Sequence, residues 1–161
     1  MSPAISAREE IHAVLLALAG DTLLLPNAAV AEVVAADRLQ PAAQGPAWLA
    51  GTMPYQDYRL RVLRFEVLNG ATPSANTRRT RVAILHGISG RLTGGQYALI
   101  CQGHPNLVTL NREALRHEPR HAADREDLVL ARVKIANTSA VIPNLEQIEI
   151  ELARLDKNEN P

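Results

Sequence analysis

The chain of 161 residues has few aromatic side chains and no excess of charge of either sign. Aromatic residues make up only 3% of the sequence, which disfavours a surface on which nucleic-acid bases stack. The 17 lysines and arginines are matched by 17 acidic residues, so no net field attracts a phosphate backbone or an anionic membrane. We therefore expect neither nucleic-acid binding nor direct membrane insertion.

Cysteine and long apolar segments are also scarce. Cys101 is the single cysteine, which excludes an internal disulfide and is typical of a reduced protein of the cytoplasm. The apolar run at 11–19 is shorter than the roughly 20 residues of a membrane span. Glu9 and Glu10 stand ahead of it, where a secretory signal has positive charge. The sequence thus predicts a cytoplasmic protein.

Short apolar runs separated by turn residues recur along the chain, a pattern typical of a mainly β barrel or sandwich. A strand over 58–67 requires a bulge near Val62 and Leu63, because its apolar side chains otherwise change face. Further strands are expected at 11–19, 22–25, 30–36, 81–86, 96–101, 107–110 and 128–135.

Loops are predicted at 37–46, 69–79 and 112–127, and Pro46 can begin one helical turn that holds Trp48. The segment 144–153 fits either a closing helix, because Asn144 and Gln147 form a capping pair, or a strand, because its apolar residues alternate. We expect a flexible segment at 1–10, a single domain over 11–155 and a disordered tail at 156–161.

The segment His117-Glu118-Pro119-Arg120-His121 has the letters of a zinc-protease motif. That motif requires a helix that points both histidines at one metal ion, and Pro119 is incompatible with such a helix. We therefore predict a solvated loop and no catalytic or metal site. A zinc-dependent hydrolase that uses His117, Glu118 and His121 remains an alternative hypothesis. No phosphate-binding loop is present, so no cofactor is predicted.

Several stretches resemble the CheW-like coupling domains of bacterial chemosensory systems. Val30-Ala31-Glu32-Val33-Val34 resembles the family's Val-x-Glu-Ile step, and Trp48-Leu49-Ala50-Gly51 resembles its aromatic-Ile-x-Gly step. The segments at 60–65, 96–101 and 140–143 resemble three further strand segments of the family. Leu23-Leu24-Leu25-Pro26-Asn27 and Arg64-Phe65-Glu66 look closest to members from pilus-associated, twitching-type systems.

The resemblance implies two small SH3-like, five-stranded barrels that share a core, with one or two short helices. It implies a non-enzymatic adaptor that binds a CheA-like histidine kinase regulatory domain and the helical tip of a methyl-accepting chemoreceptor. A scaffold of the same fold with a different protein partner is an alternative. A third hypothesis, a β-barrel that binds a small ligand, lacks the cluster of inward polar residues that it requires.

The resemblance also implies where partners bind. The implied partner-binding residues are Glu32, Val33, Gln56, Asp57, Arg59 and Arg61. Two of these positions differ from the family pattern, because Gln56-Asp57 replaces its Arg-Gly pair and Arg61 replaces its strand proline. Arg59 and Arg61 form a basic strip suited to an acidic partner. Each of the six can equally be an ordinary strand or turn residue.

Overall fold

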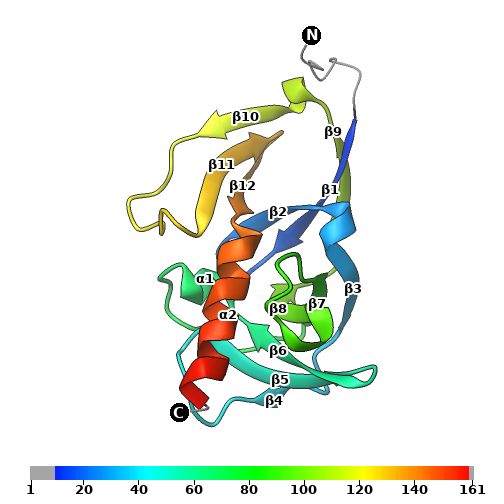
Figure 1. Cartoon of the computed structure of the whole chain (residues 1–161). Helices are drawn as coiled ribbons and strands as arrows, with labels where there is room; N and C mark the ends of the chain where they lie inside the picture. Colours follow the sequence, from blue (N-terminus) through cyan, green and yellow to red (C-terminus); the bar gives the residue numbers. More distant parts are fainter. Residues whose placement is uncertain (1–9, 160–161) are drawn as a thin grey trace.

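Two β-sheets form two stacked lobes, as Figure 1 shows for the computed structural model, which describes residues 10–159. The first sheet, drawn at the top, consists in spatial order of β10 (Leu115–Glu118), β11 (Val129–Ile135), β12 (Thr138–Pro143), β2 (Thr22–Pro26), β1 (Ile11–Ala17) and β9 (Asn106–Leu110). The second sheet consists of β3 (Val30–Ala35), β7 (Thr80–His86), β8 (Gln96–Gln102), β6 (Tyr58–Leu63), β5 (Leu49–Tyr55) and β4 (Gln40–Pro41).

Helices are few. The α-helices of the described residues are the short α1 (Phe65–Leu68) and the long α2 (Leu145–Glu159). Three single 3₁₀ turns are η1 (Asn27–Ala29), η2 (Thr93–Gly95) and η3 (Arg112–Ala114). The predicted fold class is confirmed as mainly β and is consistent with two SH3-like barrels, although each sheet has six strands rather than five. Neither α-helix within residues 10–159 has the combination of length and apolar character that a membrane span requires.

The two lobes share one apolar core, which is the largest cluster of buried side chains. Leu16 and Leu23 enter it from the first sheet, Leu85 and Leu99 from the second, and Ile148 from α2; all five are at most 1% exposed. Each such side chain contributes about 1.5–3 kcal/mol by leaving water. Smaller clusters fill each lobe separately, around Val82 and Ile100 in the second and around Val133 in the first.

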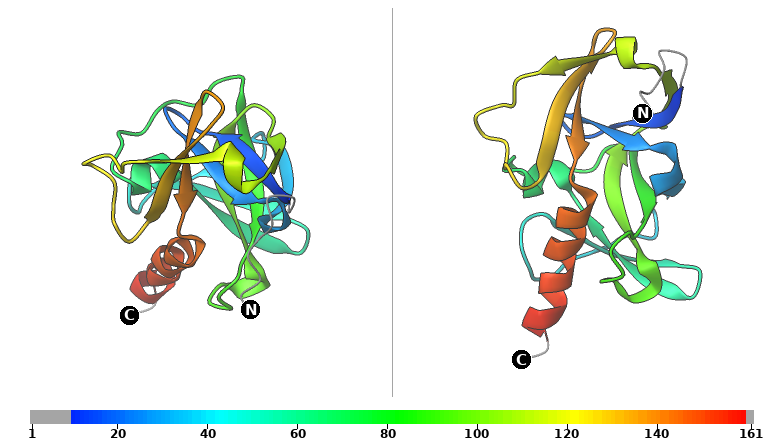
Figure 2. Two further views of the ribbon diagram at one scale, coloured as in Figure 1. Left: turned by 90° about the horizontal axis from the view of Figure 1, so that it is seen from above. Right: turned by 45° about the horizontal axis from the view of Figure 1, so that its top comes forward.

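Helix α2 leaves the end of β12 and runs down beside the second lobe (Figure 2). Of the two alternatives for 144–153, the helix is therefore correct. Asn144 caps it, because its Oδ1 accepts a hydrogen bond from the Gln147 amide at 3.2 Å. Ile148 and Leu152 are spaced one turn apart and are buried in the shared core. The apolar alternation that suggested a strand instead places these two residues on one helical face.

A buried carboxylate ties α2 to the loop before η2. Glu149 is fully buried, and its oxygens accept hydrogen bonds from the Ile88 amide at 3.0 Å and from the Ser89 hydroxyl at 2.8 Å. The Ser89 amide donates a further bond at 3.2 Å. This carboxylate thus satisfies loop amides that have no strand partner.

A buried ion cluster joins the first sheet to the rest of the molecule. Arg132 on β11 forms a two-pronged pair with Asp124, with Nε–Oδ2 and Nη2–Oδ1 distances of 2.7 and 2.8 Å, and a second pair with Asp21 at 3.0 Å. Asn69, just after α1, donates to Asp124 at 3.0 Å and accepts from the Arg125 amide at 2.9 Å. The loop at 119–128 is therefore anchored to both lobes.

Several predicted boundaries were wrong for identifiable reasons. The strand predicted over 58–67 ends at Leu63, and 65–68 instead form α1, which buries Phe65 in the shared core. The expected bulge lies in the partner strand, where the register shifts between Leu49 and Gly51 opposite Val62 and Leu63. Pro46 does begin a turn, closed by its carbonyl and the Leu49 amide, but Leu49 already belongs to β5.

Two segments are more ordered than predicted. Residues 115–118 pair with β11 as strand β10, where a solvated connection was expected. Residues 156–159 continue α2, where a disordered tail was expected, and Asp156 pairs with Arg61 at 2.7 Å. The remaining tail residues, 160–161, and residues 1–9 of the predicted flexible segment lie outside the described residues. Cys101 is free and buried, and burial raises the pKa of its thiol to about 12.

Gly51 provides a test of the packing of β5. Its φ is +152°, and a Cβ at this position would overlap the backbone carbonyl oxygen of Gln40 on β4. We expect Gly51→Ala to lower the free energy of unfolding by about 2–4 kcal/mol, through strain and steric overlap. Urea denaturation followed by circular dichroism measures this. Gly20→Ala is the control, because Gly20 also has a positive φ but open space around it; equal losses in both variants would contradict the steric argument.

The Arg132–Asp124 pair predicts a pH-dependent contribution to stability. Hydrogen bonds from Arg132, together with those from Asn69 and the His121 amide, hold the pKa of Asp124 below its usual range. The contribution is therefore complete above the unfolded-state pKa of about 3.9 and is lost as the pH falls through the lower folded-state pKa. Asp124→Asn should lower the free energy of unfolding at pH 7 by about 3 kcal/mol, because it leaves a buried guanidinium short of one partner.

Urea titrations of both proteins between neutral pH and pH 3 test this expectation. The stability difference between wild type and Asp124→Asn should narrow below about pH 4. The control is Asp127→Asn, since Asp127 pairs with Arg125 but its side chain is 51% exposed, and the expected cost is under about 1 kcal/mol. A difference that stays constant with pH, or a control that costs as much, would show that the charge of Asp124 is not what stabilises the fold.

Candidate interaction surfaces

The β5–β6 hairpin carries four of the six predicted partner-binding residues. Its turn consists of Gln56 and Asp57, both exposed, and Gln56 adopts a positive φ of 52°. Arg59 and Arg61 follow on β6 and, two residues apart, lie on the same face of the strand. The structure thus places Gln56 and Asp57 at a protruding tip and the two arginines on the adjoining sheet face.

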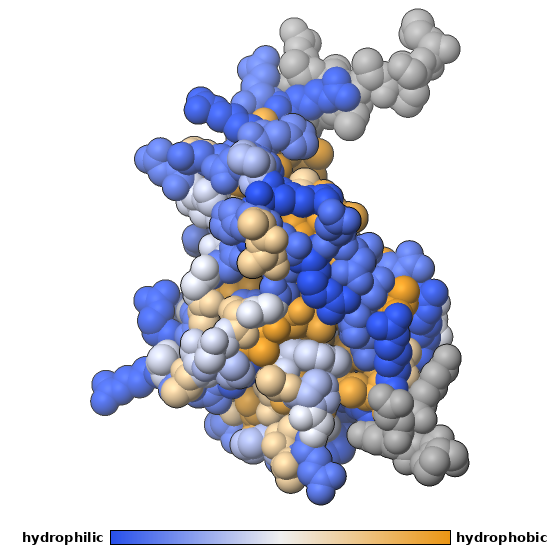
Figure 3. All heavy atoms as spheres, turned by 90° about the vertical axis from the view of Figure 1, so that its left-hand side faces the viewer, coloured by the Kyte–Doolittle hydropathy of each residue, from blue (hydrophilic) through white to orange (hydrophobic). Residues whose placement is uncertain are grey.

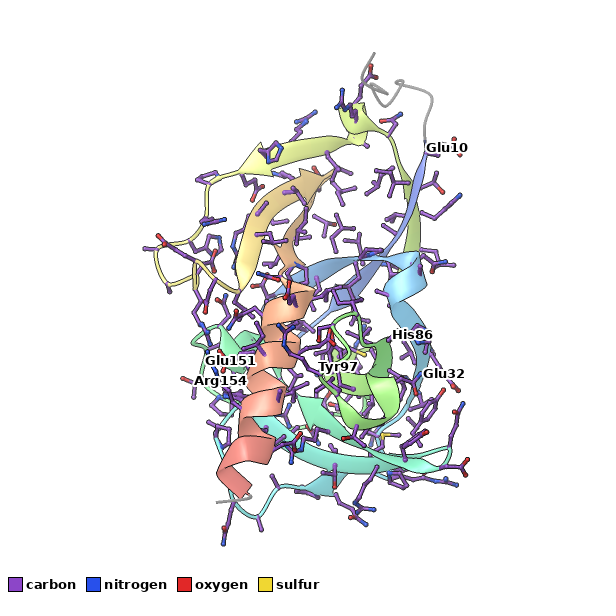
Figure 4. The ribbon with its side chains drawn as sticks, viewed as in Figure 1. Glu10, Glu32, His86, Tyr97, Glu151 and Arg154 are labelled. Carbon is purple, nitrogen blue, oxygen red and sulfur yellow. The ribbon has the colours of Figure 1, made fainter. Side chains whose placement is uncertain are left out.

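Glu32 and Gln56 line a common pocket of about 300 Å³, here called the Glu32 pocket. Glu32 lies on β3 at one end of the second sheet, on the side of the lobe away from α2 (Figure 4). The hydroxyl of Tyr55 on β5 donates a hydrogen bond to Glu32 Oε2 at 2.6 Å. This bond links β3 and β5, which are not neighbours in the order of the sheet. This hydrogen bond, with partial desolvation and the nearby carboxylate charge, raises the pKa of Tyr55. The other lining residues are Val34, Ala35, Asp37, Arg38, Met53 and Pro54.

Val33 does not share this surface. It alternates with Glu32 along β3 and is half buried, packing against the shared core. Its side chain therefore contributes to core packing, and the structure does not bring it together with the other predicted partner-binding residues.

Arg59 and Arg61 line a second pocket, of about 500 Å³, here called the arginine pocket. It lies between the second sheet, η2 and the last turns of α2. Arg61 Nη2 contacts Asp156 of α2 at 2.7 Å, and Arg61 Nη1 donates to the Leu152 carbonyl at 3.3 Å. The remaining lining residues are Thr52, Leu92, Thr93, Gln96 and Tyr97.

A third concave surface is apolar and was not predicted. This interlobe groove, of about 340 Å³, is lined from both lobes and from the start of α2. Ile88 and Leu130 at its border are 62% and 52% exposed, unusual for large apolar side chains. Its other lining residues are Leu24, Leu25, Pro26, Ile142, Pro143, Asn144, Leu145 and Glu146. In Figure 3, apolar side chains are visible at the waist of the molecule, beneath a mostly hydrophilic upper end.

Sequence reasoning missed this groove because four separate segments build it. Two signals pointed to it individually: Ile88 is apolar within a glycine-rich turn, and Leu130 lies next to buried Val129 on the opposite face of β11. Neither signal indicates by itself that the two side chains border one surface.

The zinc-like motif is divided between a strand and a loop. His117 and Glu118 lie on β10, opposite Val133 and Arg132 of β11, while His121 follows in the loop. Glu118 accepts a hydrogen bond from the Ser139 hydroxyl at 3.0 Å. Within residues 10–159, no group of histidine, cysteine or acidic side chains is arranged to hold a metal ion. The prediction of a solvated loop was wrong for 117–118, and the helix that the hydrolase hypothesis requires is replaced by a strand.

Comparison with known proteins identifies the fold. The scaffolding protein TtCheW from Thermoanaerobacter tengcongensis resembles the chain with a TM-score of 0.69 at 16% identity, over 85% of this chain and 90% of that one. No curated protein matches the chain in sequence. The CheW-like domain family matches residues 12–151, which is nearly the whole described length. The chain therefore belongs to the family of CheW-like domains, the scaffolds of chemotaxis signalling.

Proposed function

We propose that the protein is a non-enzymatic cytoplasmic adaptor that couples a chemoreceptor to a CheA-like histidine kinase. The observation that carries the proposal is the family match over residues 12–151 on a chain whose concave surfaces suit protein partners. A scaffold works by holding two partners close together, so it needs two separate contact surfaces. The interlobe groove and the Glu32 pocket are two such surfaces.

The interlobe groove suits the helical tip of a receptor. An amphipathic helix binds by laying one apolar face into an apolar groove, with polar contacts at the rim. Ile88 and Leu130 offer exposed apolar contacts, while Glu146 and Asn144 supply a polar border. An interface of this size is modest and fits transient signalling contacts.

The Glu32 pocket and the hairpin tip suit the CheW-like regulatory domain of the kinase. β3 is an end strand of the second sheet, and Glu32, Gln56 and Asp57 project beside it. Contact between two small barrels rests on a limited patch with a polar rim, which this surface supplies.

A second candidate is a scaffold of the same fold for a different partner. The hairpin tip favours this second candidate. Where the family resemblance places an Arg-Gly pair, this chain has Gln56 and Asp57, so a negative charge replaces a positive one at the tip. The narrower proposal of a pilus-associated, twitching-type pathway rests on the segments 23–27 and 64–66. Deletion of the gene would then reduce twitching and leave swimming unchanged.

A substitution that introduces a charged side chain into the interlobe groove tests whether the receptor binds there. We expect Leu130→Glu to weaken binding of a receptor-tip helical fragment by at least about tenfold, because it places a carboxylate in an apolar contact. Isothermal calorimetry with the purified fragment measures this. Leu107→Glu is the matched control, since Leu107 on β9 is 75% exposed and does not line the groove. Equal affinity of both variants would remove the groove from the receptor contact.

Kinase binding is tested at Glu32. We expect micromolar, one-to-one binding to the regulatory domain of a chemosensory kinase from the same cell, and a loss of about tenfold or more in Glu32→Arg. Tyr55→Phe removes the hydrogen bond to Glu32 but leaves its charge, so its affinity should stay within about twofold of wild type.

The control for charge reversal is Glu113→Arg, at an exposed position in η3 of the first lobe. If Glu32→Arg and Glu113→Arg bind alike, the kinase does not contact the Glu32 pocket. If wild type binds no kinase regulatory domain while the receptor fragment still binds, the scaffold for a different partner is the correct alternative.

A further inference from the structure

We propose that the arginine pocket is a carboxylate-binding site that Asp156 of α2 occupies, and that an acidic segment of a partner protein takes its place. The inference deepens the proposed adaptor function, and rests on it only for the partner being a protein. It also gives a role to Arg59 and Arg61, which the groove and the Glu32 pocket do not use.

The first argument is the charge of the pocket. Two guanidinium groups line it together with Thr52, Thr93 and Gln96, whose side chains are polar and uncharged. Asp156 is the one acidic residue among the described residues that line it. Guanidinium groups match carboxylates in shape and hydrogen-bonding pattern, so this lining favours a carboxylate over an apolar or cationic group.

The second argument is that the pocket already holds a carboxylate in a replaceable manner. Asp156 pairs with Arg61 at 2.7 Å, but its side chain is 51% exposed and it belongs to the end of α2. Exposed ion pairs contribute little to stability, and the last turn of a helix opens easily. A carboxylate from a partner can therefore displace Asp156 at a small cost in free energy. Leu152 and Asp156 also lie beyond residue 151, where the family match ends.

The third argument is hydrogen-bonding capacity that is left unused. The hydroxyl of Tyr97 is buried and has no hydrogen-bond partner within the described structure. Tyr97 is a residue of β8 (labelled in Figure 4) and lines the arginine pocket together with Leu152 of α2. Burial, with the nearby Glu149 carboxylate, raises the pKa of this hydroxyl, so it remains a donor. Arg59 is exposed and forms no ion pair within residues 10–159. A carboxylate-rich segment that binds in the pocket can therefore pair with Arg59, and the Tyr97 hydroxyl lies in the same lining.

The neighbouring elements hold the pocket open. The ring of Tyr58 lies against Gly94, where a Cβ would come within 2.9 Å of the ring. This contact keeps η2, and with it Thr93, beside the two arginines. Glu149 fixes the preceding loop to α2 through the Ile88 and Ser89 amides. Removal of the last helical turn thus uncovers a prepared site and does not require the sheet to rearrange.

Fluorescence anisotropy with a fluorescein-labelled hexaglutamate peptide tests the proposal on the full chain. Asp156→Asn removes the internal carboxylate that competes with the peptide, and should therefore tighten peptide binding several-fold relative to wild type. Glu113→Gln, with the same change in net charge on the first lobe, should leave the affinity near that of wild type. Arg59→Gln should weaken binding several-fold, and Arg78→Gln, in the exposed loop at 69–79, should not.

Three results would overturn the proposal: Asp156→Asn and Glu113→Gln bind alike, Arg59→Gln and Arg78→Gln bind alike, or inorganic phosphate displaces the peptide as well as unlabelled hexaglutamate does. Amide hydrogen exchange supplies a second measurement, since bound peptide should speed exchange over 156–159, and unchanged protection would contradict displacement. Circular dichroism confirms that each variant is folded. The peptide titration tests only the arginine pocket, whereas the kinase titration tests the proposed adaptor function. A failure of the pocket proposal can therefore be distinguished from a failure of the proposed function.

Discussion

The shared apolar core between the two lobes, the largest cluster of buried side chains, is the constraint on which the rest of the structure depends. Leu16 and Leu23 from the first sheet meet Leu85 and Leu99 from the second, and Ile148 of α2 closes the cluster. Since hydrophobic burial is the dominant favourable term in folding, the lobes are held as one unit. The interlobe groove exists only because the lobes meet at this core, with Leu25 buried in the core and also lining the groove.

Buried polar groups specify how the lobes and helices meet. An apolar core tolerates sliding more readily than a set of directional bonds does. Arg132 with Asp124 and Asp21, and Glu149 with the loop at 87–89, supply such bonds at two separate places. Arg125 adds a third, because it pairs with Glu151 of α2 at 2.7 Å. Their geometry fixes the loop at 119–128 and the position of α2, and therefore the borders of the groove and of the arginine pocket.

A scaffold acts by binding its partners and not by catalysing a reaction. The concave surfaces of this fold are suited to such binding. The three concave surfaces differ in character: apolar in the interlobe groove, acidic and aromatic at the Glu32 pocket, and cationic at the arginine pocket. Such differences allow distinct partners to be selected by complementarity, which contributes more to specificity than to affinity. Because α2 borders both the groove and the arginine pocket, one helix connects two of the three surfaces.

The sequence by itself determined the mainly β fold class and most strand positions, because alternating apolar runs and turn residues are local patterns. Its short motifs also indicated the family, which the match over residues 12–151 confirms. It also placed Glu32 and Gln56 among the partner-binding candidates, and the structure brings them to one pocket. Only the tertiary structure decided that 65–68 leave the strand to bury Phe65, that 115–118 pair with β11, and that 145–159 are helical. It alone decided that Val33 faces the core, that Ile88 and Leu130 border one groove, and that Asp156 reaches Arg61. These outcomes rest on contacts between residues far apart in the chain, and a local pattern contains no information about which distant surface will cover it.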